Sequence, residues 1–498
     1  MPKLTDHLKT LKPYQIVFLI LIFSGCCAFA FKSLSLIHYT SLWNDELATA
    51  EKSFQPSFAS LLDQLRNDVH PPVYYVVLWE FSKMFGQTAT FLRAFSWVSY
   101  LGGAVLLCFA SWSYSGRGTA AVLTLVFALA LPVTVTYSIE GKAYAFIYAL
   151  ICSATFFRLR LLAGEPGAAY SYGINWCFAA LTHYYGMGLL LCQLGLDLRA
   201  RRRTVKSLAW ALVAPTLWML VNLGFLVGRG GRRWLRKAGT WLLEDTLELM
   251  LGTYWPLILF ILVILVLALC FTTSQGKENR SSSLISDWGL DASGLLFLTT
   301  FLISIFKPSS FPRYYVVILP SLIGVFFCWV ALQLQDPYRR QQRFAMVSIS
   351  MTLVLGIFWF DSFQALIPQT KGADRYENDF RTPALIAAQS QLKFTPQCEK
   401  FNVYDHVLRQ ERLLDPAAAW NCLTETNQSL TAWSETVLGS ATANKSEVFL
   451  AVTGPSVHGA RTIEPYIAAL QARGLRCFSD PHNTTFMRAF HCNDKPLT

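Results

Sequence analysis

The stretch Trp43-Asn44-Asp45-Glu46 and the stretch His70-Pro71-Pro72-Val73-Tyr74-Tyr75 both follow the first long apolar segment of the chain. Charged side chains beside a lipid bilayer are costly, and membrane proteins usually keep them for function. Two adjacent carboxylates and a histidine in such a place therefore indicate where the chemistry of this protein lies. They also indicate the side of the membrane, once the direction of the first span is known.

The composition indicates a membrane protein. The chain has 498 residues, of which 53% are hydrophobic and 15% charged, whereas a soluble protein carries roughly 25% charged residues. Repeated apolar runs of about 18 to 24 residues are long enough to cross a hydrocarbon core of ~30 Å. The net charge of +11 comes mostly from short connections between these runs, where basic residues set topology. We therefore expect a polytopic helical membrane protein that binds membrane lipids and no nucleic acid.

Eleven transmembrane helices are expected. Residues 73–85 are apolar but short and contain Glu80 and Lys83, so we interpret them as a re-entrant or interfacial helix. This choice places the main basic clusters in the cytoplasm, as the positive-inside rule requires. The expected spans are 14–36, 91–113, 119–137, 142–162, 171–183, 184–198, 206–227, 255–273, 289–306, 315–334 and 344–363.

This topology predicts a protein of the cell (inner) membrane with a cytoplasmic N-terminus and an extracytoplasmic C-terminus. Span 14–36 is interpreted as a retained anchor. One basic segment falls on the external face instead, at Arg229, Arg232, Arg233, Arg236 and Lys237. Either the topology is wrong there, or the segment is an interfacial amphipathic helix whose cations hold an anionic lipid phosphate. In that second case Trp234, Leu235, Trp241 and Leu242 would lie in the membrane.

The character of the chain changes after the last span. Two domains are expected: a transmembrane domain over 1–363, with a first external loop at 37–90, and a small extracytoplasmic α/β domain over 364–498. Short strands are predicted at 401–406, 447–453, 475–478 and 484–491, with a helix at 463–473. An even number of cysteines in an external domain favours two disulfides over a zinc site, with the pairing left open. These cysteines are Cys398, Cys422, Cys477 and Cys492.

Four external connections collect the unusual residues. They supply carboxylates, histidines, tyrosines and cations at one membrane face, which predicts a single external cavity. Sugar transfer from a lipid phosphate needs a base near the acceptor and cations near the leaving phosphate. The residues are Asp45, Glu46 and His70; Glu140 and Lys142; His183 and Tyr184; and Arg313 and Tyr314.

Each of these residues also has a purely structural interpretation. Asp45 and Glu46 could cap the helix that follows Asn44, and His70 could cap the helix after the two prolines. Glu140 and Lys142 could pair with each other. The remaining alternatives are a satisfied bundle histidine at His183, an interfacial anchor at Arg313 and Tyr314, and snorkelling to the head groups at Arg93.

Together the motifs resemble one superfamily. In order they are Trp-x-Asp-Glu, His-Pro-Pro-x-Tyr-Tyr, Leu-Arg-x-x-Ser, Tyr-Ser-x-Glu-x-Lys-x-Tyr, Thr-His-Tyr and Arg-Tyr, and they cover residues 14–330. This combination resembles the GT-C integral-membrane glycosyltransferases. The most similar branch is that of glycosyltransferase family 39, the protein O-mannosyltransferases, and the lipid A aminoarabinose transferases are more distant. The C-terminal domain carries no motif that adds to the resemblance.

The resemblance implies an inverting transferase that uses a polyprenyl-phosphate sugar. It implies that Asp45 is the catalytic base and that Glu46 supports it. Arg93 would lie at the external start of span two and contact the substrate phosphate. Lys142 stands where such proteins commonly have Arg, which puts bidentate phosphate contact there in doubt. Some relatives bind a divalent metal (Mg, Mn or Zn) near the phosphate, for which His70 and His183 are the candidate ligands here.

The sequence therefore predicts an enzyme: a glycosyltransferase that moves a hexosyl or pentosyl group from a polyprenyl phosphate to an extracytoplasmic protein, lipid or glycan. Two other functions stay open. One is a transporter or flippase for a lipid-linked substrate, although the sequence shows no symmetric pair of broken helices. The other is a structural subunit of an envelope assembly.

Overall fold

The computed structural model describes residues 41–493, except 67, 225–234, 272–277, 336–338, 365–379, 416–418, 424–428, 445–446, 454–455 and 484–486, together with scattered positions between 25 and 37. The chain divides into two compact units, which alternate along the sequence. The first, here called the helical unit, comprises Met1–Ser35, Leu62–Val76 and Ala94–Ile367. The second, called the mixed unit, comprises Leu36–Leu61, Val77–Arg93 and Pro368–Thr498.

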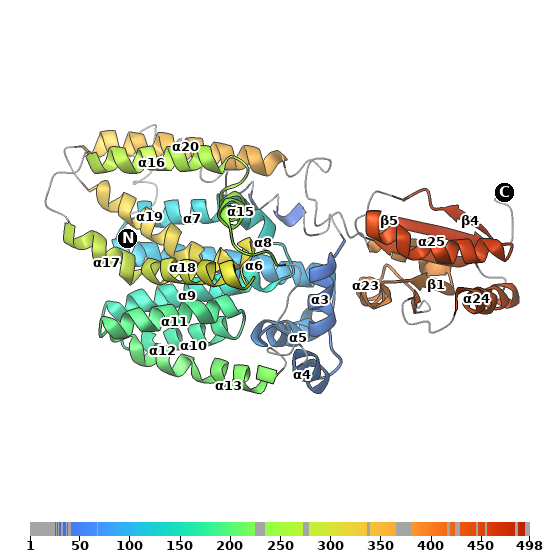
Figure 1. Cartoon of the computed structure of the whole chain (residues 1–498). Helices are drawn as coiled ribbons and strands as arrows, with labels where there is room; N and C mark the ends of the chain where they lie inside the picture. Colours follow the sequence, from blue (N-terminus) through green and yellow to red (C-terminus); the bar gives the residue numbers. More distant parts are fainter. Residues whose placement is uncertain are drawn as a thin grey trace. The chain divides into compact units, whose positions relative to one another are not determined.

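Long apolar helices dominate the helical unit (Figure 1). Within the part of the chain that the structure describes, four stretches are long and apolar enough to cross a membrane: α6 (Ala89–Ser115), α9 (Ala143–Leu162), η1 with α19 (Pro312–Gln333), and residues Arg340–Asp361 of α20. Helices α15 (Thr240–Leu251) and α16 (Trp255–Phe271) form one further pair, bent by 77°. The predicted class, a polytopic α-helical membrane protein, is confirmed. The count of eleven spans stays a prediction, and most of span 14–36 lies outside the described residues.

Shorter helices complete this unit. Proline at the first position of α8 interrupts the expected span 119–137, because its ring cannot continue the preceding helix. The remaining helices are α7 (Gly118–Ala130), α8 (Pro132–Tyr137), α10 (Ala168–Ala180), α11 (Tyr184–Arg199), α12 (Val205–Ala211), α13 (Val213–Val221), α17 (Glu278–Asp287) and α18 (Leu290–Phe306).

Aromatic side chains form much of the core of the helical unit. Tyr100 of α6 stacks on Tyr148 of α9 with ring centroids 4.5 Å apart, and both side chains are buried. Gly324 of α19 lies against the ring of Trp288, where a Cβ would come within 2.0 Å of the indole. Only glycine therefore permits this helix to approach the buried tryptophan.

A buried ion pair joins three helices at one end of the same unit. Arg158 of α9 and Asp197 of α11 are each 2% exposed, and two hydrogen bonds of 2.6 and 2.9 Å connect them. Arg158 also donates to the backbone carbonyls of Asp287 and Ser286, where α17 ends. Arg158 belongs to a basic cluster that the sequence predicts to be cytoplasmic, and the structure shows that its side chain also holds the helices together.

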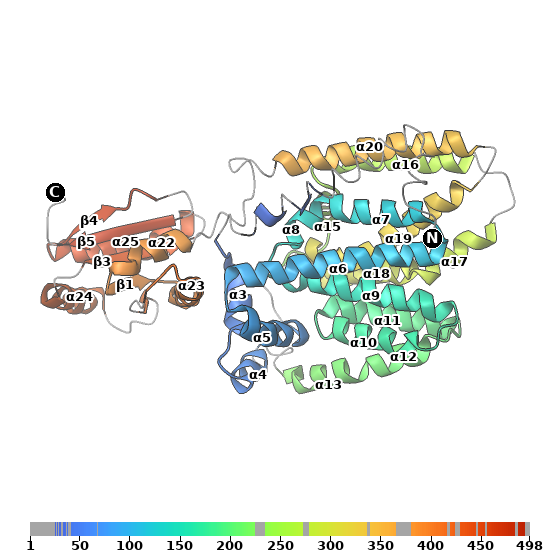
Figure 2. The ribbon, with the colours of Figure 1, turned by 180° about the vertical axis from the view of Figure 1, so that it is seen from behind.

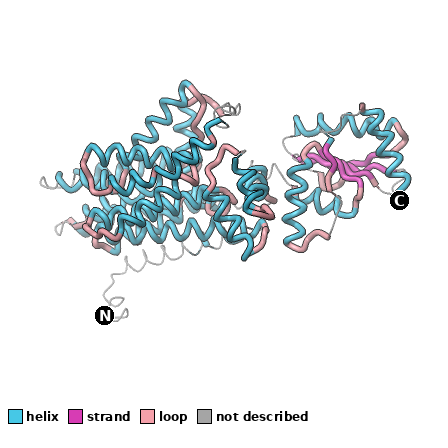
Figure 3. Tube along the Cα trace, turned by 90° about the horizontal axis from the view of Figure 1, so that it is seen from below, coloured by secondary structure: helices cyan, strands magenta, loops and turns pink. Residues whose placement is uncertain are grey.

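The mixed unit contains the five-stranded sheet of the chain (Figure 3). The strand order is β2-β1-β3-β5-β4, in which β1 pairs in parallel with β2 and β3, and β5 pairs antiparallel with β3 and β4. Figures 1 and 2 show the helices around this sheet. The strands are β1 (Leu392–Thr395), β2 (Asn421–Cys422), β3 (Val448–Thr453), β4 (Arg476–Ser479) and β5 (Met487–Asn493).

Both faces of the central strand are covered, since every residue of β3 is buried. On one face Val448, Leu450 and Val452 join the apolar core formed with α24 (Leu430–Asn444) and α25 (Ser456–Ala472). On the other face Phe449 contacts Trp420, which stacks on Phe401 of α23 (Cys398–Gln410). The strand predicted at 447–453 and the helix predicted at 463–473 are confirmed.

The strand predicted at 401–406 is wrong, because these residues lie inside α23. Phe401, Tyr404, Val407 and Leu408 are buried, and their spacing of three and four residues is that of one helix face. Six residues were too few to distinguish the two-residue repeat of a strand from the 3.6-residue repeat of a helix.

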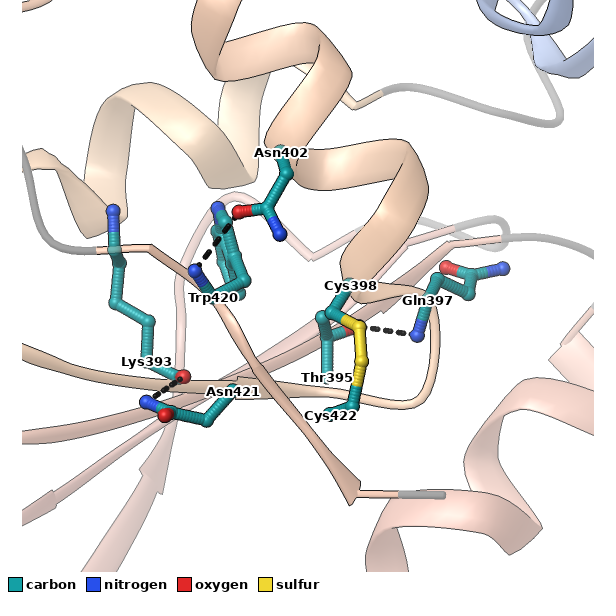
Figure 4. The surroundings of a disulfide bond; sticks show 8 residues. All are labelled: Lys393, Thr395, Gln397, Cys398, Asn402, Trp420, Asn421 and Cys422. Carbon is teal, nitrogen blue, oxygen red and sulfur yellow. Dashed lines mark hydrogen bonds between the residues drawn. A yellow bond between two sulfur atoms is a disulfide. The ribbon is translucent and has the colours of Figure 1, made fainter. Parts of the chain in front are cut away.

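The structure forms the two expected disulfides, Cys398–Cys422 and Cys477–Cys492. The first joins the start of α23 to β2 (Figure 4). Around it, Trp420 N–H donates to Asn402 Oδ1 at 3.0 Å, and Asn421 Nδ2 donates to the carbonyl of Lys393 at 3.1 Å. The disulfide and these bonds together fix the position of α23 on the sheet.

Candidate functional site

Asp45 and Glu46 lie in the first turn of α3 (Asn44–Ser53), within the mixed unit. Asp45 is half-buried, whereas Glu46 is only 1% exposed. Glu46 accepts a hydrogen bond from the backbone N–H of Trp43 at 3.3 Å, an arrangement that caps the helix. Glu46 thus has the capping contact expected from its structural interpretation, while Asp45 is the more accessible of the two carboxylates.

Arg93 forms a buried ion pair with Glu46. Its Nε and Nη2 donate to the two carboxylate oxygens at 2.9 and 2.6 Å. The same guanidinium donates to the carbonyls of Ile37 at 2.8 Å and Ser41 at 2.9 Å, and the Arg93 side chain is 3% exposed. The structure therefore places Arg93 where it fixes the loop around Asp45, and a direct contact with substrate phosphate stays a prediction.

His70 lies in the helical unit, before α5 (Val73–Phe85). Its Nδ1–H donates to the carboxylate of Asp68, with the two oxygens at 3.1 and 3.2 Å. This bond orients the imidazole and fixes the tautomer that carries the proton on Nδ1. Asp68 was absent from the sequence-based candidates, although its position two residues before a histidine was the available signal.

The structure brings together three of the external connections predicted from the sequence. His183 caps the start of α11 by accepting a hydrogen bond from Tyr185 N–H at Nδ1, 3.2 Å away. Its ring centroid lies 6.0 Å from Tyr144 and 5.1 Å from Tyr314. The guanidinium carbon of Arg313 is 5.7 Å from the ring of Tyr144. We call Tyr144, His183, Tyr185, Arg313 and Tyr314 the His183 cluster.

Cation–π contact orients Arg313 within this cluster, since its guanidinium also lies 4.9 Å from the ring of Phe311. Tyr185 donates to Ser310 Oγ at 2.9 Å, which ties α11 to the loop that carries Arg313. Tyr184, another predicted site residue, is the first residue of α11. The predicted site residues did not include Phe311 or Ser310, whose contacts with Arg313 and Tyr185 are visible only in the structure.

Glu140 and Lys142 lie just before α9 and are 2% and 9% exposed. The backbone N–H of Lys142 donates to the Glu140 carbonyl at 2.7 Å, and the next aromatic ring, Tyr144, packs on Tyr137 at 4.9 Å. Charged groups that are this well buried are costly unless they are compensated. The turn before α9 therefore places two buried charged residues, Glu140 and Lys142, close in sequence to Tyr144 of the His183 cluster.

Three of the external cations, Arg229, Arg232 and Arg233, lie outside the described residues, as does Trp234. Arg236 and Lys237 are exposed. Leu235 and Leu242, which were expected in the membrane, are instead 9% and 0% exposed within the protein. The prediction of an interfacial helix is wrong for residues 235–239, which are not helical, because the backbone N–H of Ala238 donates to the Ser304 carbonyl.

The described residues contain no group of three or more His, Cys, Asp or Glu side chains arranged to hold a metal ion. His183 uses Nδ1 for its helix-capping bond, and His70 uses Nδ1 for Asp68. Each imidazole therefore offers at most its Nε2 to a metal ion, so most of the metal ligands would have to come from other residues. A divalent metal at His70 and His183 stays a prediction.

The fold is also found in solved structures. No family model matches the chain, and the search of curated proteins finds no relative. The apo structure of ArnT from Cupriavidus metallidurans is 14% identical, with a TM-score of 0.55 over 96% of this chain and 98% of that one. ArnT is a lipid A aminoarabinose transferase with a GT-C fold.

The chain has a GT-C fold. A second structure, ArnT from Cupriavidus metallidurans bound to undecaprenyl phosphate, has a TM-score of 0.57 at 13% identity, with the same coverage of both chains. The predicted GT-C resemblance is therefore confirmed, and the apolar helices make this GT-C protein an integral membrane protein. The likeness extends beyond residues 14–330, where the motifs lie, into the C-terminal segment. The similarity to the protein O-mannosyltransferase branch in particular stays a prediction.

Proposed function

We propose that this protein is a membrane-embedded glycosyltransferase that moves a sugar from a polyprenyl phosphate to an extracytoplasmic acceptor. The observation that carries the proposal is the GT-C fold over 96% of the chain, shared with a transferase that has been solved with undecaprenyl phosphate. Histidine, tyrosine and arginine side chains from separate connections meet in the His183 cluster, and buried Glu140 and Lys142 lie next to it. Such a group of side chains is suited to an anionic ligand.

Asp45 is the proposed base. Its carboxylate takes the proton of the acceptor hydroxyl or amine, and the acceptor atom attacks the anomeric carbon from the face opposite the phosphate. The bond between the anomeric carbon and the phosphate oxygen breaks, and its electron pair leaves with the phosphate. The configuration at the anomeric carbon inverts. Glu46 supports this step by holding the start of α3 through Trp43 and Arg93.

Lys142 and Arg313 are the proposed partners of the leaving phosphate, where negative charge grows in the transition state. The guanidinium of Arg313 can donate two parallel hydrogen bonds to a phosphate, whereas Lys142 acts as a compact point charge. We assign Glu140, His183, Tyr184 and Tyr314 to positioning the donor. The N-terminus in the cytoplasm and the active site on the outer face of the inner membrane are part of this proposal.

The test is a transfer assay with purified protein in lipid nanodiscs, using a panel of polyprenyl-phosphate hexoses and pentoses. Asp45→Asn keeps the size of the side chain but removes its basicity, so transfer should fall by about 100-fold or more, the range of a general base. Asp63→Asn is the matched control, since Asp63 is an exposed aspartate in the same loop. Wild-type rates in Asp45→Asn would disprove the assignment of the base.

A transporter of lipid-linked substrates is the second candidate, favoured by the bent pair α15 and α16. Broken helices line the substrate sites of many transporters, but they occur there in symmetric pairs, whereas the described residues contain a single bent pair, which makes at most one broken span. Movement of the lipid across proteoliposomes without sugar transfer would favour the transporter. A structural role in an envelope assembly would be favoured by a protein that neither transfers nor moves a donor.

A further inference from the structure

The C-terminal segment holds the loop that carries Asp45, and helix α23 makes most of these contacts. All of the residues concerned belong to the mixed unit. Helix α23 packs against α3, where Lys400 Nζ lies 3.4 Å from Glu51 Oε2. Tyr404 is 3% exposed and lies beside the side chain of Ser41. Helix α23 therefore contacts the first external loop as well as the sheet.

The end of α23 also fixes the start of α6. His406 Nε2–H donates to Gln87 Oε1 at 2.7 Å. Glu411, the residue after the helix, accepts a hydrogen bond from the backbone N–H of Ala89 at 3.0 Å. Ala89 is the first residue of α6, so a carboxylate from the distant C-terminal segment caps this helix. A carboxylate there satisfies an open N–H group and is stabilised by the helix dipole.

Ser41 links these contacts to the buried ion pair. Its hydroxyl accepts a hydrogen bond from the backbone N–H of Phe380 at 3.1 Å, and its carbonyl accepts one from Arg93. Arg93 in turn holds Glu46, the neighbour of Asp45. A displacement of the C-terminal segment would therefore act on the backbone on both sides of Asp45, at Ser41 and at the start of α6.

We propose that Tyr404, His406 and Glu411 are positioning residues for sugar transfer, because they hold α3 and the start of α6 in the arrangement that aims Asp45 at the acceptor. The inference rests on the proposed function, with Asp45 as the base. These residues touch no substrate and act through the loop. The disulfide at Cys398 and the bonds around it anchor α23 to the sheet, so the sheet serves as the rigid support.

The test compares two double variants in nanodiscs. His406→Ala/Glu411→Ala removes both contacts at the start of α6, and His406→Gln/Glu411→Gln keeps a hydrogen-bonding group at each position. Glu435→Ala is the matched control, because it removes an exposed carboxylate from the same C-terminal segment. Two quantities are measured: amide hydrogen exchange in the absence of substrate, and kcat and KM for transfer.

In the alanine variant we expect exchange of the amides at the start of α6, residues 89–93, to rise at least tenfold and kcat to fall at least tenfold, with KM for the donor unchanged. The glutamine variant should recover most of both values, and Glu435→Ala should match the wild type. Unchanged exchange in β3 would show that the variants are folded. If the alanine variant itself loses protection in β3, Tyr404→Phe, which removes only a hydroxyl, serves as the second variant.

Unchanged exchange at the start of α6 would overturn the contact, and faster exchange with unchanged kcat would overturn the positioning role. A rise in KM with constant kcat would also overturn it, since that result indicates direct binding of the donor. Because exchange needs no substrate, it still decides whether the C-terminal segment holds the start of α6 if the wild type transfers no sugar. In that case the proposed function fails, and the positioning role fails with it.

Discussion

Replacing Arg93 by methionine removes the guanidinium that pairs with the carboxylate of Glu46. Glu46 would remain 99% buried and would keep the hydrogen bond from the Trp43 N–H at 3.3 Å. Breaking a buried ion pair by removal of one partner costs about 3–5 kcal/mol. We therefore expect Arg93→Met to destabilise the loop around α3 by that amount.

The double variant Arg93→Met/Glu46→Leu should be much more stable than the single variant. Replacing both partners of a buried pair by apolar groups is often neutral. The double variant also loses the helix cap on Trp43, worth about 1 kcal/mol, whereas the Arg93 bonds to Ile37 and Ser41 are lost in both variants and cancel in the comparison. The difference between the single variant and the double variant is then at least about 2 kcal/mol. This non-additivity is what a double-mutant cycle measures.

The assay is amide hydrogen exchange of residues 41–53, because a loss of 3–5 kcal/mol speeds local opening by roughly two to four orders of magnitude. The pair would be unimportant for the loop if Arg93→Met changed exchange less than tenfold, or if the double variant were as labile as the single one. Transfer kinetics of the folded double variant then test the other role of Arg93. An increased KM for the donor would indicate that Arg93 contacts the phosphate.

Three further predictions concern other parts of the chain. Asp197→Ala leaves Arg158 charged and buried, so a thermal melt should report a loss of about 3–5 kcal/mol, whereas Glu165→Ala, at an exposed ion pair, should cost less than about 1 kcal/mol. Burial lowers the pKa of His406, so the folded state binds this proton less readily than the unfolded chain. Stability of the mixed unit should therefore be complete above about pH 6.5 and fall as pH drops below it, and His406→Gln should flatten that profile. The cysteines of the two disulfides are 24 and 15 residues apart. Reduction of either disulfide should therefore lower the free energy of unfolding by about 3 kcal/mol through loop entropy and lower the midpoint of urea unfolding.

The sequence predicted those features that depend on composition and on the spacing of apolar residues along a segment. Apolar runs predicted the helices, and the strand at 447–453 was recognisable because it is short, apolar and bounded by polar residues. The strand predicted at 401–406 was wrong because six residues fit the apolar spacing of a strand as well as that of a helix. The break before Pro132 was readable in principle, because proline favours the first position of a new helix.

The site could be predicted only as residue types and not as contacts. Glu46 and Arg93 were both chosen from motifs, but their pairing joins residues 47 positions apart, and nothing in either motif specifies it. The contact between Ala89 and Glu411 spans 322 positions. Such pairings arise from the packing of whole elements, so a single sequence gave no signal that the C-terminal segment and the first loop share one compact unit.

That shared unit has a consequence for biosynthesis. Residues 36–61 and 77–93 leave the ribosome long before Phe380, Tyr404 and Glu411, on which their packing depends. Chains are synthesised at about 5–20 residues per second, so α3 is made tens of seconds before its partners. During that interval Glu46 and Arg93 can find each other but lack the C-terminal contacts around them. Folding of the mixed unit is therefore completed only when the last segment has been made and has packed against the loop made first.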